Sequence, residues 1–280
     1  MSLKPKTKIP FTLSQDIRPE DQLPIATIGI EAFLPDIQTQ LKLFNLPPQP
    51  ITTTHIGNWL SNPACHVVKA VSTETNEIMG CICWATRGYV PRPPQAERTQ
   101  GRFTEKDGDV EGEGEGKRNS GIQRLEDYSD GHFVRFMTDI MPEGTKCWFI
   151  GGLNVAPRFQ GMGVGRALME WGLRRVEEDG VFAWVNSSES AWKAYQACGF
   201  EVVRELRLEL DEFAEGEAVG RGPEREGRWG SYVFSDVYKD GYSSSKEVHQ
   251  KILKKELKNE ALYKSFRYSN GYNYSPTESI

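Results

Sequence analysis

A glycine-rich turn between an apolar strand and a helix is the stretch of this sequence best suited to bind a ligand. The run Cys147–Val155 is apolar and β-favouring, and Pro157 must end it because proline has no N–H to donate to a sheet. Apolar residues recur at helical spacing over residues 164–171, which predicts a helix from about Gly163. The first N–H groups of a helix have no intrahelical partner and lie at the positive end of its dipole. The turn therefore predicts a binding site for a diphosphate.

The spacing of the glycines excludes two common phosphate-binding loops. A dinucleotide fingerprint, Gly-x-Gly-x-x-Gly, would need glycine at Arg166 when counted from Gly161, or at Leu168 when counted from Gly163. The Gly-Lys-Ser/Thr end of an ATPase loop is absent from this stretch. The turn instead contains Gln-x-x-Gly-x-Gly at residues 160–165.

A second motif, Tyr-x-x-x-Gly-Phe, follows at residues 195–200. Between the two motifs we predict one strand, residues 181–186, and one short helix, residues 190–198, which ends at Gly199. The two motifs in this order resemble the coenzyme A pyrophosphate loop and the closing tyrosine block of the GNAT superfamily of N-acetyltransferases. The resemblance covers residues 147–210 closely and the rest of the chain loosely.

The resemblance implies an α+β fold, with a GNAT-like mixed, largely antiparallel central sheet, flanking helices and one splayed parallel strand pair. The strand that ends at Val155 and the strand that ends at Asn186 would form that pair. The resemblance also implies acetyl-CoA (coenzyme A) as the cofactor, bound in the splay. The residues expected to contact it are Leu153, Asn154, Val155, Gln160, Gly161, Met162, Gly163, Val164, Gly165, Arg166, Ser188 and Tyr195.

Tyr195 is the catalytic residue that the resemblance implies. An amine attacks the acetyl carbonyl, and a phenol near the sulfur would protonate the leaving thiolate. The alternative is a tyrosine that only packs in the core of an amphipathic helix. Ser188 stands where many relatives carry an asparagine that contacts pantetheine, so a shorter hydrogen bond is expected there.

The sequence does not identify a general base. Glu31, His132 and Asp139 are candidates by position, and each is also interpretable as an ordinary surface charge. Cys147 and Cys198 flank the two motifs, but nothing nearby in the sequence would lower a thiol pKa, so we expect direct transfer rather than an acetyl-cysteine. Four histidines without metal-ligand spacing predict no metal site.

Composition and charge place the chain among intracellular proteins. We expect one acetyltransferase domain over residues 8–240, with a disordered insertion at 91–120 and a basic, aromatic tail at 241–280. The net charge of −5 argues against nonspecific nucleic-acid binding. Five cysteines without a paired framework predict reduced thiols, hence a cytoplasmic location with the nucleus left open. No stretch is apolar enough to span a membrane.

Several further elements are expected from periodicity and turn signals. Asp21 should cap the first helix, a strand should precede it, and a strand hairpin should surround residues 73–77. The expected spans are strands at 11–18, 66–71, 78–85, 202–210 and 229–238, and helices from 21 to 33, from 37 to 44 and from 133 onwards.

The function predicted is N-acetyl transfer from acetyl-CoA to an amine by direct attack. Small amines, amino acids, peptides and lysine side chains all remain open as acceptors, because this fold serves them all. The alternative is a module that binds acyl-CoA, has lost catalysis and regulates or recruits a partner. Neither the oligomeric state nor the length of the acyl group follows from the sequence.

Overall fold

The computed structural model describes residues 9–44, 54–89 and 120–241. Apart from Ser120, the predicted insertion lies outside the described residues, as does the predicted tail apart from Gly241. Ser120 is instead the first residue of a helix.

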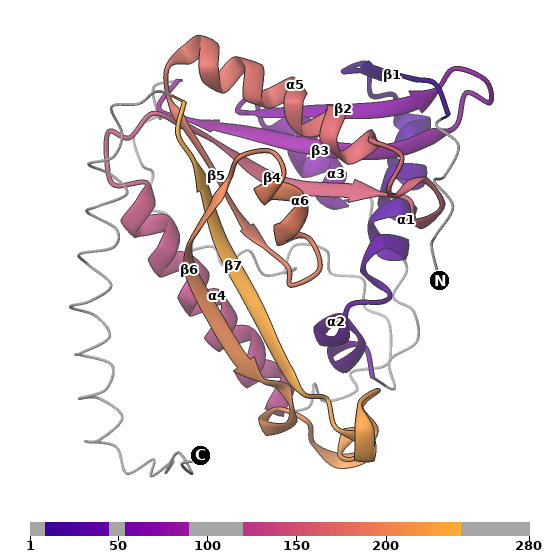
Figure 1. Cartoon of the computed structure of the whole chain (residues 1–280), viewed down its shortest axis with the longest axis vertical. Coiled ribbons are helices and arrows are strands. Elements are labelled where there is room, and N and C mark those ends of the chain that lie inside the picture. Colours follow the sequence, from indigo (N-terminus) through magenta and orange to yellow (C-terminus); the bar gives the residue numbers. More distant parts are fainter. Residues whose placement is uncertain (1–8, 45–53, 90–119, 242–280) are drawn as a thin grey trace.

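A seven-stranded sheet in the order β1-β2-β3-β4-β5-β7-β6 forms the centre of the molecule (Figure 1). Adjacent strands run antiparallel, except β4 and β5, which run parallel. The expected α+β fold with a mixed, largely antiparallel sheet is therefore confirmed. The strands are β1 (Phe11–Ser14), β2 (Cys65–Ser72), β3 (Ile78–Arg87), β4 (Cys147–Val155), β5 (Phe182–Ser187), β6 (Glu201–Glu209) and β7 (Ser231–Lys239).

Helices cover both faces of this sheet. On one face, α5 packs over the centre of the sheet and α6 lies beside the diverging strands (Figure 1). The other face carries α1 and α3 over one half and α4 over the other half. The helices are α1 (Gln22–Phe33), α2 (Ile37–Lys42), α3 (Thr54–Ser61), α4 (Ser120–Ile140), α5 (Val164–Asp179) and α6 (Trp192–Gln196).

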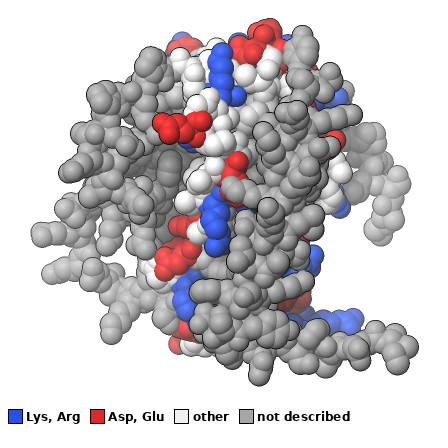
Figure 2. All heavy atoms as spheres, turned by 90° about the vertical axis from the view of Figure 1, so that its left-hand side faces the viewer, with Lys and Arg blue, Asp and Glu red and all other residues white. Residues whose placement is uncertain are grey.

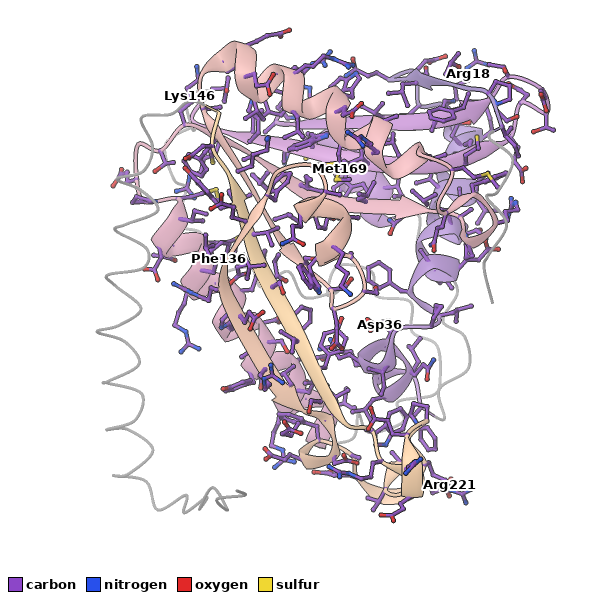
Figure 3. All side chains as sticks on the ribbon, viewed as in Figure 1. Arg18, Asp36, Phe136, Lys146, Met169 and Arg221 are labelled. Atoms are coloured by element: carbon purple, nitrogen blue, oxygen red, sulfur yellow. The ribbon has the colours of Figure 1, made fainter. Side chains whose placement is uncertain are left out.

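Apolar side chains fill both interfaces between helices and sheet. Met169 of α5 packs in one core with Trp84 and Val185. Phe136 of α4 packs in the opposite core with Trp184. Figure 3 labels Met169, on α5, and Phe136, on α4. The alternation of side chains along β5, with Val185 on one face and Trp184 on the other, produces this two-sided burial.

Strands β4 and β5 pair only at their beginnings. Their parallel register runs Cys147↔Phe182, Trp148↔Ala183 and Phe149↔Trp184, and then stops, although both strands continue. Figure 1 shows the two arrows starting together and diverging. This divergence, here called the splay, comprises residues 150–155 of β4 and residues 185–187 of β5. The expected splayed parallel pair is thereby confirmed.

The register between β3 and β4 contains a bulge beside the splay. Cys83 pairs with Gly152 and Trp84 pairs with Ile150, so Gly151 is an extra residue on β4. A bulge bends its strand and increases the local twist. Gly152 is covered by α3, since an added Cβ would lie 2.7 Å from the ring of Trp59. The bulge therefore coincides with the point at which β4 leaves β5.

Several local features differ from the sequence-based expectations, including helix α4, which begins at Ser120 rather than at residue 133. Strand β1 ends at Ser14 rather than continuing to Arg18. Asp21 occupies the N-cap position of α1, but its carboxylate binds Lys69 at 2.5 Å and caps no N–H of that helix. Helix α3 was not predicted, because eight residues are too few for a stable isolated helix and its support comes from packing onto β2 and α1.

The side of the molecule that carries α4 has mixed charge. Figure 2 shows acidic and basic side chains interspersed on the described part of this face. The exposed charged residues of α4 include Arg124, Asp127, Asp130 and Arg135. The described part of α4 therefore presents no run of positive charge. Across the described ranges, no helix combines the length and the apolar character that crossing a bilayer requires.

Candidate active site

The predicted phosphate turn has the backbone geometry of an open cradle. Strand β4 ends at Val155, a 3₁₀ turn spans Pro157–Phe159, and α5 begins after its N-cap residue Gly163. Gly161 and Gly163 have φ values of 78° and 91°, in the left-handed region that favours glycine. A Cβ added at either position would meet no atom within 4 Å. Glycine is needed at both positions because of the positive φ, and the space beside each is open to a ligand.

The beginning of α5 leaves hydrogen-bond donors for such a ligand. The Ala167 N–H donates to the Gly163 carbonyl at 3.0 Å. This is the first hydrogen bond within the helix. Helix geometry gives no intrahelical acceptor to the three earlier N–H groups, those of Val164, Gly165 and Arg166. These donors lie in the first turn of a helix, where the dipole also favours an anion. The turn is therefore suited to a phosphate group.

Gln160 connects the turn to the end of β4. Its side-chain Nε2 donates to the Val155 carbonyl oxygen at 3.0 Å. The first residue of the motif therefore fixes the path of the backbone into the glycine turn, and its amide group is directed at the protein rather than at a phosphate.

The edge of β4 that faces the splay offers main-chain groups. The Ala156 N–H donates to the Met79 carbonyl at 3.0 Å, and Asn154 pairs with Cys81 of β3. In an antiparallel ladder, alternate residues direct their N–H and C=O groups to opposite neighbours. Leu153 and Val155 therefore direct theirs towards β5, which by this point has diverged.

Asn154 points away from this edge. Its main chain pairs with β3, and its side-chain Nδ2 lies 3.5 Å from the position of a Cβ added at Gly29 of α1. The Oδ1 atom is buried and has no hydrogen-bond partner in the described residues. The structure thus places the Asn154 side chain on the α1 face, apart from the other predicted cofactor residues.

The remaining predicted cofactor residues have distinct environments. Val164 is buried in the core, so only its backbone faces the turn, and Met162 is half-buried against the same core. Arg166 is exposed and its Nε donates to Glu170 at 2.8 Å. A Cβ at Gly165 would lie 3.5 Å from the Val155 side chain, so the first turn of α5 is close to β4.

Ser188 lies directly after β5, on the other side of the splay. Its hydroxyl lies 3.4 Å from that of Ser190, and its carbonyl accepts from the Ala191 N–H at 3.1 Å. The segment from Ser187 to Ala191 is thus folded back into the start of α6. Ser188 is half-buried, which leaves part of its surface open to a ligand.

Tyr195 lies on α6 and packs into the core under α5. It is 5 % exposed, and its ring makes an edge contact with Phe200 at 5.8 Å between centroids. No described residue hydrogen-bonds to its hydroxyl. Burial raises the pKa of Tyr195 well above its ordinary value, and Cys198 nearby adds to this rise. The phenol therefore holds its proton at neutral pH, as a general acid must.

The two cysteines that flank the motifs are poor nucleophiles. Cys147 is fully buried, and burial raises the pKa of its thiol to about 12. Burial also raises the pKa of the Cys198 thiol, although Arg166 opposes that rise. The thiolate is the reactive form of cysteine, so both environments disfavour an acetyl-cysteine.

The three candidate bases lie in different parts of the fold. Glu31 of α1 lies 3.8 Å from Arg158, and Asp139 of α4 lies 3.1 Å from Arg204. His132 of α4 places Nε2 3.0 Å from the Asp236 carboxylate. The described residues contain no cluster of three or more His, Cys, Asp and Glu side chains that could hold a metal ion.

Comparison with protein families identifies the fold as a known one. Residues 34–200 match the model of the acetyltransferase (GNAT) family, a span that includes both motifs. The chain belongs to the acetyltransferase (GNAT) family. No curated protein sequence matches it.

Solved GNAT structures have the same fold at low sequence identity. Arylalkylamine N-acetyltransferase 2 from Aedes aegypti is 13% identical, with a TM-score of 0.54 over 83% of this chain and 99% of that one. The mosquito arylalkylamine N-acetyltransferase like 5b is 14% identical, with a TM-score of 0.52 over 82% of this chain and 100% of that one. At this identity the likeness concerns the fold alone.

Sequence reasoning missed two parts of this GNAT domain near the splay. One is α3, whose Trp59 covers Gly152. The other is the pair of contacts that Asp236 makes with His132 and with Asn186. A signal for the second was present, because Asp236 interrupts a largely apolar strand, β7, and the structure buries it fully. A carboxylate at such a position requires polar partners.

Proposed function

We propose that this GNAT domain is an N-acetyltransferase that moves an acetyl group from acetyl-CoA to an amine by direct attack. The observation that carries the proposal is the edge of β4 that has lost β5 as its neighbour and leads directly into the glycine turn. Leu153 and Val155 direct main-chain groups into the splay, where the parallel pairing with β5 has ended.

The residues present fit acetyl-CoA. The open space beside Gly161 and Gly163, next to the free N–H groups of α5, suits a diphosphate. The main-chain groups of Leu153 and the N–H of Val155, whose carbonyl already accepts from Gln160, suit amides of pantetheine, since extended chains add to open strand edges through such bonds. Because the Asn154 side chain lies on the α1 face, we leave it out of the set that holds acetyl-CoA.

A cavity lies along α5, and its lining includes Arg166 in the first turn of that helix. It has a volume of about 320 Å³ and lies between α5, the end of α6 and the end of β7. Its charged lining includes Arg166, Arg174 and Lys239, together with Glu170 and Glu177. Glu170 already binds Arg166, so the three cations exceed the two carboxylates by one positive charge, which suits a further phosphate group beyond the diphosphate.

The residues of the chain then perform binding and proton transfer. When bound, acetyl-CoA supplies an activated acetyl carbonyl and a thiol leaving group. The turn and the β4 edge hold the donor in place, and proximity of this kind lowers the barrier by reducing the entropy lost on reaction. Tyr195 holds a proton at its hydroxyl and donates it to the departing sulfur.

The experiment that tests the proposal measures binding and turnover separately. Acetyl-CoA, NAD and ATP are compared for their effect on the melting temperature, and coenzyme A release is followed with a panel of amines, amino acids and peptides. We expect stabilisation by acetyl-CoA alone, which at a hundredfold excess over Kd amounts to about 2.7 kcal/mol. Equal stabilisation by NAD would contradict the assignment. Binding of acetyl-CoA without release against any acceptor would favour the noncatalytic module.

A further inference from the structure

A buried polar network joins α4 to the sheet next to the splay. The carboxylate of Asp236, on β7, is fully buried and has two partners. His132 of α4 places Nε2 3.0 Å from Asp236 Oδ2, and Asn186 of β5 donates from Nδ2 to Oδ1 at 2.6 Å. Asn186 and Asp236 are also directly opposite in the β5–β7 register. Each oxygen of the carboxylate is therefore engaged.

The network determines which ring nitrogen of His132 can accept a proton. Neutral imidazole has one N–H and one acceptor nitrogen. A carboxylate against Nε2 favours the tautomer in which Nε2 carries the proton, as carboxylates do for histidines that act as bases. Nδ1 is then left as a lone-pair acceptor. The His132 side chain is 12% exposed, so the ring is held firmly and still reaches the surface.

One member of the network, Asn186, lies on the part of β5 that has separated from β4. Trp184 stacks on Phe149 at the last β4–β5 pair, with 5.1 Å between the ring centroids. Phe133, which follows His132 on α4, lies 6.2 Å from the same Trp184 ring. Asn186 lies two residues beyond Trp184, where β5 no longer has β4 as a neighbour.

The two faces of the splay separate the acid from this network. Tyr195 packs with α5 on one face, whereas His132 belongs to α4 on the other. Since the proposed phosphate turn belongs to the α5 face, the inference places the approach of the amine on the α4 face. Glu31 and Asp139 are less suitable there, because each contacts an arginine that an amine cation would have to displace.

We propose that His132 is the proton acceptor for the amine, with Asp236 and Asn186 as its positioning residues. This inference rests on the proposed acetyl transfer. The ammonium form of the acceptor gives one proton to His132 Nδ1, and the neutral nitrogen then forms a bond to the acetyl carbon. As the C–S bond breaks, sulfur takes the proton of Tyr195. Of the two protons that leave nitrogen, one restores Tyr195 and the other passes from His132 to solvent.

Two variants of α4 test the proposal. His132→Gln retains an N–H for Asp236, so the buried carboxylate keeps a partner, but an amide cannot accept the proton. Asp139→Asn is the matched control, because Asp139 and Arg204 form a similarly buried pair between α4 and β6, with side chains 13% and 11% exposed. Both variants are assayed for acetyl-CoA affinity, and for turnover with a primary alkylamine and with an aromatic amine.

The two amines distinguish a base from a structural residue. A primary alkylamine is protonated at neutral pH and must lose a proton before attack, whereas an aromatic amine is already neutral. We expect His132→Gln to lower alkylamine turnover by roughly 10²–10⁴-fold and aromatic-amine turnover by less than about 10-fold, with acetyl-CoA affinity unchanged. Asp139→Asn should retain turnover with both amines.

Three results would overturn the inference. Full alkylamine turnover by His132→Gln would exclude His132 as the base and leave the proposed transfer intact. Equal losses with both amines, accompanied by a lower melting temperature, would identify the network as structural. If the wild-type protein binds acetyl-CoA and acetylates no amine in the panel, the proposed function and the role of His132 fail together.

Discussion

Gln160 donates from its side-chain Nε2 to the main-chain carbonyl of Val155 at 3.0 Å. This bond closes a short loop between the last residue of β4 and the first residue of the glycine motif. In the proposed site, Val155 also faces the acyl donor. Gln160 therefore acts on cofactor binding through the backbone that it holds.

We predict that Gln160→Glu weakens acetyl-CoA binding by about 10-fold, which corresponds to about 1.4 kcal/mol. The ionised carboxylate has no N–H for the Val155 carbonyl, and it places negative charge beside the proposed diphosphate site. Gln40→Glu is the control, because Gln40 Nε2 makes the same kind of bond, to the Leu34 carbonyl at 3.0 Å, away from the turn. Calorimetry of both variants measures the effect, and equal affinities would contradict it.

Gly163→Val should abolish measurable acetyl-CoA binding while the protein remains folded. The added side chain fills the open space beside the turn, and φ of 91° is unfavourable for a β-branched residue. Gly144→Val is the matched control, because Gly144 also has a positive φ, 81°, and open space around its Cβ position. Both variants should lose about 1–3 kcal/mol of stability, and only Gly163→Val should lose affinity. If Gly163→Val binds acetyl-CoA with normal affinity, the glycine turn is not the diphosphate site.

Local features explain why the cradle was predictable from sequence. Pro157 ends the strand, and glycine at 161 and 163 permits positive φ, so neither depends on distant residues. The position of the Asn154 side chain was not predictable in this way. It follows from the register of β4 on β3, which a bulge at Gly151 shifts, and a shift of one residue exchanges the two faces of a strand.

Contacts between distant segments explain the rest. His132 and Asp236 are 104 residues apart, and their contact depends on how α4 lies across β7. The part of α4 before residue 133 has a polar, glycine-containing sequence. Its helical state depends on the packing of residues such as Leu125 against β6 and β7. Periodicity within one segment carries no information about such partners.

Gly172→Ala should destabilise the protein although alanine favours a helix. A Cβ at Gly172 would lie 2.1 Å from Cε2 of Trp84, whose Nε1 donates to the Leu168 carbonyl at 3.3 Å. The helix-propensity gain is about 1 kcal/mol, whereas overpacking a core costs about 1–3 kcal/mol or more, so a net loss is expected. Gly131→Ala in α4 has open space and should be stabilising. If Gly172→Ala and Gly131→Ala change the melting temperature in the same direction, this explanation is wrong.

Alkaline pH should lower stability through Tyr195. Burial raises the pKa of the folded phenol, so the folded protein keeps its proton where the unfolded chain begins to lose it. The stabilising contribution is complete below the unfolded pKa of about 10 and decreases as pH rises above it. Denaturant unfolding of wild type and Tyr195→Phe should show a smaller decrease in the variant above about pH 10. If the free energy of unfolding depends on pH in the same way in both proteins, burial does not raise the pKa of the Tyr195 phenol.

Tyr195→Phe also separates binding from chemistry. The variant keeps the ring that packs against Phe200 and removes only the hydroxyl, which has no partner among the described residues, so the fold and acetyl-CoA affinity should change little. Turnover should fall by roughly 10²–10⁴-fold, the usual contribution of a general acid.

Tyr238→Phe provides the control, because Tyr238 is also buried but its hydroxyl donates to Asp240. Loss of that bond should lower stability by about 1 kcal/mol and leave turnover unchanged. The measurements are affinity by calorimetry and turnover with any amine that the wild-type protein acetylates. Full turnover by Tyr195→Phe would show that the phenol is structural and that the sulfur takes its proton from water. A loss of acetyl-CoA affinity as large as the loss of turnover would instead assign Tyr195 to binding.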